Sequence, residues 1–229
     1  AAVLNGKLMV AGGVTSLKPP KFNHRLWRLD LARADMQWEA VKDAEKPGYP
    51  KKDDSFLEVQ GRILAAAEAH NGAFHVLGGF TLEENPEEGK KYWNALAGGW
   101  RFKPGKKYRV GFNTLNDADI PLGRITTVPI ADSKIVVIGA QGAVRADTIP
   151  EVIQSPRIEE KILIYHSILD AWSKYGQWPQ AKAGAAVTQI EEPFRFERIS
   201  NFIVLGGLTS DGQLTTSVQK GIIKTVRHF

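Results

Sequence analysis

The sequence predicts an all-β fold in which a four-stranded unit recurs, the architecture of a β-propeller. Composition is the first observation: the 229 residues include 22 Gly and 12 Pro but only two Met, which is typical of strands joined by tight turns. Second, the apolar stretches are only four to eight residues long, and the hydrophobic fraction of 43% favours a globular domain over a disordered or membrane-spanning chain. The third observation is an apolar stretch that returns four times.

The returning stretch is a short apolar strand that ends in two small residues. Its copies are Leu8–Gly13, Phe74–Gly79, Ile135–Ala140 and Phe202–Gly207. The second small residue falls at positions 13, 79, 140 and 207, so the spacings are 66, 61 and 67. A nearly constant spacing predicts one structural unit per copy.

An earlier strand is expected before each copy. Asn5-Gly6 and Asn71-Gly72 supply the positive φ of a two-residue hairpin turn, and Asp132-Ser133 occupies the same place in the third unit. Upstream of the last three turns are stretches of small and β-branched residues: Arg62–Ala69, Arg124–Ile130 and Ala183–Ile190. Each unit therefore begins with a β-hairpin.

Aromatic strands complete the units. In each of the first three units a third strand is predicted, followed by a fourth strand that contains an aromatic residue. These are Leu26–Asp30 followed by Trp38, Gly99–Phe102 followed by Tyr108, and Ile162–Tyr165 followed by Trp172. In the last unit Ser217–Val226 can supply the corresponding strand. The units are approximately 1–60, 61–122, 123–182 and 183–229, within a single domain 1–229. Trp27, Trp38, Trp100 and Trp172 are expected in the core. Trp93 and Trp178 fall outside the pattern and are expected to be exposed contacts.

The Gly pair, followed by an aromatic and then by a Trp, is similar to the kelch motif. Within the kelch group the sequence resembles the bacterial N-acetylneuraminate epimerase (sialic acid mutarotase) family and its cyclically permuted relatives. The segments that carry this resemblance are Ala2–Gly13, Trp27–Leu31, Gly61–Ala65 and Leu205–Val218. The resemblance implies a six-bladed propeller, sugar isomerase chemistry and a periplasmic or secreted location.

Mutarotation opens and recloses a hemiketal, so one group must accept the proton of the anomeric hydroxyl and another must protonate the ring oxygen. The family pattern places a glutamate after the strand-terminal glycine and an arginine several residues later. This sequence keeps Arg145 but has Ala140 where the resemblance expects the glutamate. The resemblance thus implies a sugar acid of the sialic acid type bound at one propeller face, with Arg145 contacting its carboxylate, and it leaves the catalytic residue unassigned.

Five residues are candidate ligand-binding residues. Arg145, Asp147 and Glu151 share a long loop after the third apolar strand; the alternative is a solvated loop with ordinary ion pairs. Arg62 and Arg124 each follow a Gly at the start of an inner strand, so their side chains are expected at the central channel. A repeated structural ion pair explains both equally well.

Other chemistry is excluded or disfavoured. The absence of Cys excludes disulfides, thiolate metal sites and a cysteine nucleophile. His24, His75 and His166 are isolated on different units, so no metal site and no cofactor are expected, and His75 is expected to be a packed strand residue. The net charge of +5 comes from dispersed Lys and Arg among 25 carboxylates, which argues against nucleic acid or membrane partners. The acidic run Glu83–Glu88 is interpreted as a solvated loop.

Two questions stay open at this stage. The partner is either a small sugar acid or, for a non-catalytic kelch module, a protein bound by the insertion loops Val14–His24, Lys42–Gln60, Phe80–Leu96 and Gln141–Glu160. The length corresponds to about three and a half units, which fits a compact four-bladed ring or the C-terminal two-thirds of a six-bladed one. The start at Ala1, without Met, leads us to expect further residues upstream.

Overall fold

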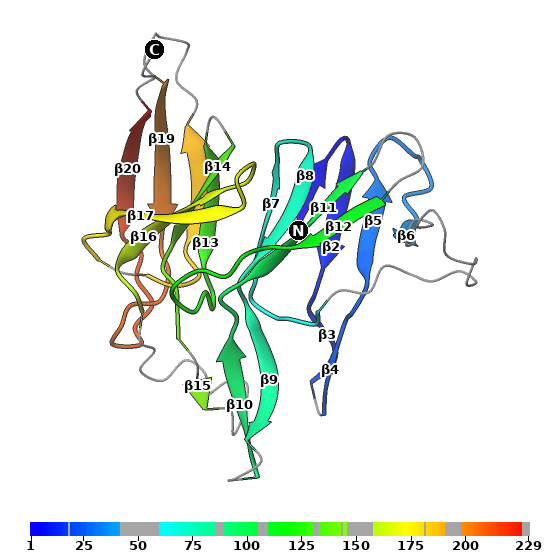
Figure 1. Ribbon diagram of the computed structural model, residues 1–229, viewed down its shortest axis with the longest axis horizontal. Coiled ribbons are helices and arrows are strands. Elements are labelled where there is room, and N and C mark those ends of the chain that lie inside the picture. Colours follow the sequence, from blue (N-terminus) through cyan, green and yellow to red (C-terminus); the bar gives the residue numbers. More distant parts are fainter. Residues whose placement is uncertain are drawn as a thin grey trace.

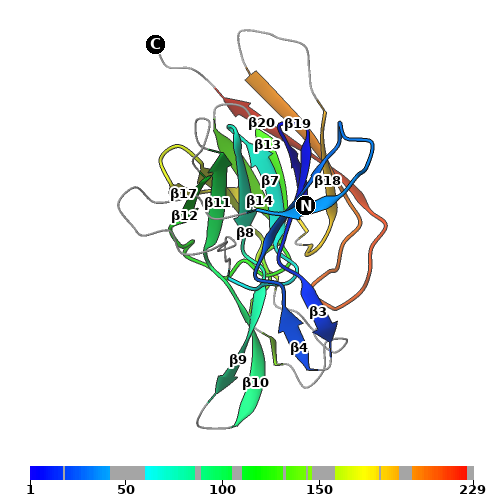
Figure 2. The same cartoon turned by 90° about the vertical axis from the view of Figure 1, so that its right-hand side faces the viewer.

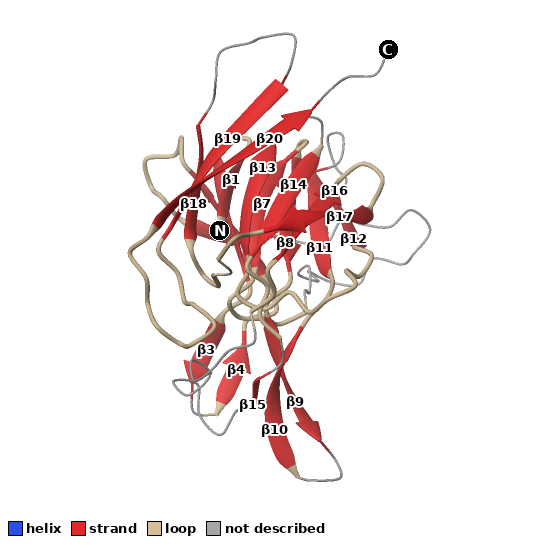
Figure 3. Ribbon diagram, turned by 90° about the vertical axis from the view of Figure 1, so that its left-hand side faces the viewer, coloured by secondary structure: helices blue, strands red, loops and turns tan. Residues whose placement is uncertain are grey.

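The computed structural model describes residues 1–17, 19–41, 60–85, 89–104, 110–130, 133–142, 144–145, 158–180, 182–190 and 198–225. All regular structure in these ranges is β-strand (Figure 3). No helix among them is long and apolar enough to cross a membrane. The predicted all-β fold is confirmed.

Four antiparallel sheets follow one another along the chain, each a meander in sequence order. Blade 1 consists of β1 (Ala2–Leu4), β2 (Lys7–Ala11), β5 (Leu26–Asp30) and β6 (Trp38–Ala40). Blade 2 consists of β7 (Ala66–His70), β8 (Ala73–Leu77), β11 (Gly99–Pro104) and β12 (Val110–Thr114). Blade 3 consists of β13 (Thr126–Ile130), β14 (Lys134–Ile138), β16 (Lys161–His166) and β17 (Ala171–Gln177). Blade 4 has three strands among the described residues: β18 (Ala186–Ile190), β19 (Arg198–Leu205) and β20 (Val218–Thr225).

The innermost strands of successive blades lie side by side. β1 contacts β7, β7 contacts β13, and β13 contacts β18. Among the described residues β18 makes no comparable contact with β1, so the four blades form an open arc from β5 at one end to β20 at the other (Figure 1).

Apolar side chains fill each of the three boundaries between blades. The buried residues between blades 1 and 2 include Leu4, Met9, Phe74, Val76 and Trp100. Those between blades 2 and 3 include Leu77, Ile135, Val137, Leu163 and Tyr165. Those between blades 3 and 4 include Val136, Ile138, Trp178, Phe202 and Val204.

Three tryptophans depart from the sequence prediction. Trp93 is 1% exposed because it packs with Phe80 and Phe22. Trp178 is 5% exposed because its ring stacks on that of Phe202. Trp38 is 47% exposed because it lies on β6, the outer edge of blade 1. The expected exposure of Trp93 and Trp178 and the expected burial of Trp38 are therefore wrong.

The small-residue pairs recur because the next blade approaches them closely. Gly12, Gly78 and Gly139 all have positive φ, and a Cβ on each would overlap a backbone carbonyl oxygen at the start of the following blade. The amide of Gly79 donates to the carbonyl of Leu122 across this contact at 2.9 Å. The pairs thus join consecutive blades through the backbone.

Two insertion loops form hairpins that project from the same end of the blades (Figure 2). One is β3 (Val14–Leu17) with β4 (Pro20–Phe22), and the other is β9 (Phe80–Asn85) with β10 (Lys90–Ala95), to which the short strand β15 (Val144–Arg145) adds. The ring of Phe22 packs edge-on against Trp93 at 6.0 Å between centroids. Of the predicted insertion Lys42–Gln60, all but Gln60 lies outside the described residues.

Candidate functional site

The turns that precede the innermost strands meet at the end of the arc that bears the hairpins. Isolated bridges pair Ile63 with Phe80, Gly123 with Gln141, and Ala183 with Leu208, so these turns can be superposed residue by residue. The residues equivalent to Arg62 are then Leu122 and Lys182. Those equivalent to Arg124 are Leu64 and Gly184. All three have positive φ, which is 53° at Leu64, 46° at Arg124 and 62° at Gly184.

Arg62 and Arg124 therefore occupy different positions, although both follow a Gly in the sequence. Arg62 lies two residues earlier in the turn than Arg124, just before the bridging residue, and is 3% exposed. Its guanidinium donates to the carbonyls of Gly78 and Gly98 at 2.9 and 3.3 Å and to the side-chain oxygen of Gln60 at 3.0 Å. Burial lowers its pKa to about 10. This geometry favours a structural role, with neutral acceptors in place of the expected ion pair; ligand binding by Arg62 stays a prediction.

Lys182 repeats the role of Arg62 in blade 4, which the sequence analysis missed. The side chain is fully buried, and its Nζ donates to the hydroxyl of Ser217 and lies 3.5 Å from the Ser217 carbonyl. That carbonyl accepts from Gly206, as the carbonyl of Gly98 accepts from Gly78. Burial lowers the pKa of Lys182. A basic residue four positions before an inner strand is the signal that Arg62 and Lys182 share.

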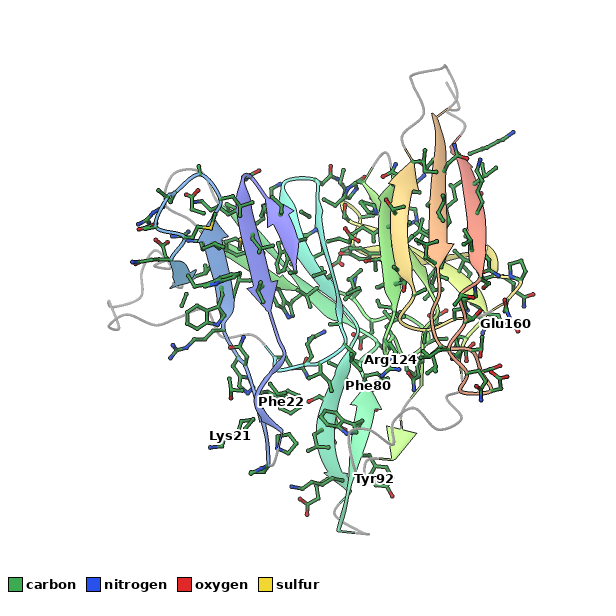
Figure 4. The ribbon with its side chains drawn as sticks, turned by 180° about the vertical axis from the view of Figure 1, so that it is seen from behind. Lys21, Phe22, Phe80, Tyr92, Arg124 and Glu160 are labelled. Atoms are coloured by element: carbon green, nitrogen blue, oxygen red, sulfur yellow. The ribbon has the colours of Figure 1, made fainter. Side chains whose placement is uncertain are left out.

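Arg124 lies at the surface of the same end. Its Cγ and Cδ pass 3.1 Å from the position that a Cβ would take on Gly184, and Phe80 packs over the preceding Gly123. Figure 4 shows Arg124 beside Phe80, with Phe22 toward blade 1 and Glu160 toward the side of blade 3. Partial burial lowers the pKa of Arg124. The guanidinium has neither a hydrogen-bond nor an ion-pair partner within the part of the chain that the structure describes.

Positive charge is thus concentrated around the inner turns. Among the described residues, Arg62, Arg124 and Lys182 form no ion pair with a carboxylate, whereas ion pairs such as Arg28–Glu39 and Lys174–Asp119 lie elsewhere. Cations without a carboxylate partner attract anions, and a guanidinium orients the oxygens of a carboxylate.

Gln141 follows the small pair Gly139–Ala140, as Phe80 follows Gly78–Gly79. It is fully buried, and its backbone exchanges hydrogen bonds with Gly123 at 2.8 and 3.0 Å. The residue directly after the third strand-terminal pair is therefore an amide. An amide cannot accept a proton as a carboxylate does.

Carboxylates do reach this region from the start of β16. The amide of Glu159 donates to the carbonyl of Ala140 at 2.7 Å, and its carboxylate lies 3.8 Å from Lys161. Glu160 is exposed on the same side. Neither carboxylate is evident from the sequence pattern, because the loop before them separates them from Ala140.

The remaining candidates are placed only in part. The backbone of Arg145 pairs with Tyr92 on β10, which brings β15 to the hairpins; the Arg145 side chain, Asp147 and Glu151 lie outside the described residues. His75 is 1% exposed, as expected for a packed strand residue, and burial lowers its pKa to about 4. The described residues contain no group of three metal-ligating side chains.

Comparisons with known proteins show the fold. No family model matches the sequence, and no curated protein does. The structure of YjhT superposes on 98% of this chain with a TM-score of 0.64 and 18% identity. The chain has the kelch propeller fold.

The kelch propeller of this chain spans 64% of the length of YjhT. A fungal alcohol oxidase of the AA5 family, solved in complex with copper, matches 90% of this chain and 35% of its own, with a TM-score of 0.52 and 12% identity. At these identities the likeness concerns the architecture.

Proposed function

We propose that the chain binds a sugar acid of the sialic acid type at the hairpin-bearing end of the propeller, with Arg124 contacting the ligand carboxylate. The observation that carries this proposal is that, within the described residues, the guanidinium of Arg124 has no hydrogen-bond or ion-pair partner, while the buried cations of neighbouring inner turns, Arg62 and Lys182, pair with no carboxylate. A guanidinium binds a carboxylate through two parallel N–H donors, which fixes the orientation of the ligand. The positive charges of Arg62 and Lys182 add an electrostatic field that favours an anion.

The neighbours of Arg124 suit an amphipathic ligand. The aliphatic stem of Arg124 passes over Gly184, which has no side chain, and the Phe80 ring packs over the adjacent Gly123. Arg145 on β15 is the second proposed contact, since the pairing with Tyr92 brings its backbone to the same hairpins. Asp147 and Glu151 stay proposed ligand-binding residues on the loop that follows.

The binding proposal is tested by titrating N-acetylneuraminate into the wild type and an Arg124→Ala variant, followed by calorimetry. A hydrogen bond to a charged group contributes about 1.5 to 3 kcal/mol, so the affinity should fall at least about tenfold. Arg28→Ala is the matched control, because Arg28 is engaged by Glu39 on the outer part of blade 1. Neutral N-acetylmannosamine should bind more weakly than the acid. Equal affinities for wild type and Arg124→Ala would refute the proposal.

We further propose binding without rapid mutarotation, because Ala140 stands where the resemblance expects the glutamate. Exchange NMR of N-acetylneuraminate should show no accelerated interconversion of the anomers with the wild type. Ala140→Glu places a carboxylate at the position where the resemblance expects it; its buried surroundings raise its pKa toward that of an effective general base, and interconversion should accelerate. Acceleration by the wild type itself would show that another base, such as Glu159 or Glu160, serves the reaction.

A protein-binding role is the second candidate. It is favoured by the hairpins that project from one end (Figure 2) and by apolar sheet faces that stay exposed on the first and last blades. Exposed apolar surface of this extent marks an interaction site.

A further inference from the structure

Among the described residues, two sheet faces in the arc have no neighbouring sheet. Blades 2 and 3 are covered on both faces, whereas within the described ranges blade 1 packs only against blade 2 and blade 4 only against blade 3. We call the uncovered side of blade 4 the forward face, comprising Ile190, Leu205, Val218 and Ile222. The uncovered side of blade 1 is the rear face, comprising Val3, Leu8, Val10, Trp27 and Trp38.

The forward face exposes positions that earlier blades bury. The residue before each small pair is 1% exposed in blade 2 (Leu77) and 2% in blade 3 (Ile138), but Leu205 in blade 4 is 42% exposed. The last residue of the innermost strand is 2% exposed at Ile130 and 41% at Ile190. On β20, Val218 and Ile222 are 65% and 52% exposed.

The rear face shows the complementary pattern. In blades 2 to 4 the residues equivalent to Leu8 are Phe74, Ile135 and Phe202, and those equivalent to Val10 are Val76, Val137 and Val204. All six are at most 1% exposed. Leu8 and Val10 themselves are only partly buried. Val3 and Trp38 are 52% and 47% exposed. The register of β1, β2, β5 and β6 places all five residues of the rear face on one side of the sheet.

We propose that the forward face of one molecule docks on the rear face of a second copy of this chain. Every boundary inside the arc joins the forward side of one blade to the rear side of the next, so this contact repeats a packing that the fold already makes three times. Within one molecule the two faces do not cover each other, because β1 and β18 make no comparable contact in the described arc. The inference stands independently of sugar-acid binding.

Charge disfavours the alternative pairing of two forward faces. Lys220 and Lys224 alternate with Val218 and Ile222 along β20 and are exposed on the same side. Two forward faces would bring these lysines together, and like charges repel when desolvated. A forward-to-rear contact is heterologous, and such contacts form an open chain of copies unless the rotation closes a ring.

The test measures molecular mass by light scattering as a function of protein concentration. The mass of the wild type should grow beyond the 25.3 kDa of the monomer as concentration rises, toward an open chain or a closed ring of copies. A forward variant carries Leu205→Lys and Ile222→Lys, and a rear variant carries Val3→Lys and Trp38→Lys. Leu169→Lys is the control, since Leu169 is 74% exposed in the turn between β16 and β17 and belongs to neither face.

Each double variant alone should be a monomer, while an equimolar mixture of the two should form a discrete one-to-one dimer, because each retains the face that the other has lost. Leu169→Lys should associate like the wild type. Circular dichroism verifies that all variants are folded. A monomeric wild type at every concentration overturns the proposal, and so does a rear variant that dimerises alone, since that outcome requires two forward faces to pair.

Discussion

His75 is a buried neutral histidine within a row of polar residues between blades 2 and 3. Glu68 on β7 and Arg101 on β11 lie directly opposite it in the sheet register. Tyr165 of blade 3 packs edge-on against its ring at 5.9 Å, and Asp170 accepts the Tyr165 hydroxyl at 2.8 Å. His70 supplies the backbone carbonyl 3.3 Å from the His75 Nε2.

Protonation of His75 should destabilise the fold. Burial lowers its folded-state pKa to about 4, below the usual 6.5, so the unfolded chain binds more protons in this window. Stability should fall as the pH falls from 6.5 to 4, by about 3 kcal/mol from this residue. Urea unfolding at several pH values measures the loss, and His75→Phe should remove most of the wild-type slope. His166→Gln, at the partly exposed end of β16, should retain it; an unchanged slope in His75→Phe would contradict the assignment.

Residue roles were the least predictable level from the sequence. Arg62 and Arg124 look alike because both follow Gly, but a two-residue offset in the turn buries the Arg62 side chain and leaves that of Arg124 only partly buried. Sequence spacing does not reveal that offset, since it depends on which residue bridges Phe80 or Gln141. Lys182 was missed for the same reason. The packing of His75 followed directly from its apolar neighbours on β8.

At the level of elements, the first glycine of each of the first three small-residue pairs is tightly constrained by the neighbouring blade. Gly78 has a φ of +60°, and a Cβ there would overlap the carbonyl oxygen of Leu122. Gly72 has a similar φ of +67°, but a Cβ there would meet open space. Gly78→Ala should therefore destabilise the chain by more than about 3 kcal/mol, and Gly72→Ala by about 1 kcal/mol, the strain of positive φ alone. Chemical denaturation compares the two, and equal losses would show that blade contact does not constrain Gly78.

Strands that belong to the repeat were predictable because hydrophobic pattern and turn chemistry agree. The hairpin before each small pair, with Asn71-Gly72 at its turn, lies where the pattern indicates. The inserted hairpins β3–β4 and β9–β10 were predicted only as loops. Their stability depends on tertiary contacts such as Phe22 on Trp93, which local sequence does not encode. The same contacts explain the unexpected burial of Trp93.

At the level of the whole molecule, the spacing of the small pairs predicted the propeller because a repeat multiplies a weak local signal. Closure of the ring is a different matter, since it depends on which sheet faces meet. The exposure of Leu205 and Leu8, compared with the burial of their counterparts, reveals the two uncovered faces. No single stretch of sequence distinguishes an end blade from an inner one.

The proposed anion site is also a property of the assembled arc, because its cations come from separate units and are brought together only when the inner turns lie side by side. Calorimetric titration of N-acetylneuraminate into the wild type and Arg124→Ala is the most direct test of the account. Measurable binding by the wild type, weakened at least about tenfold by Arg124→Ala and unchanged by Arg28→Ala, is the predicted result. Absence of binding by the wild type, or equal binding by Arg124→Ala, would contradict it.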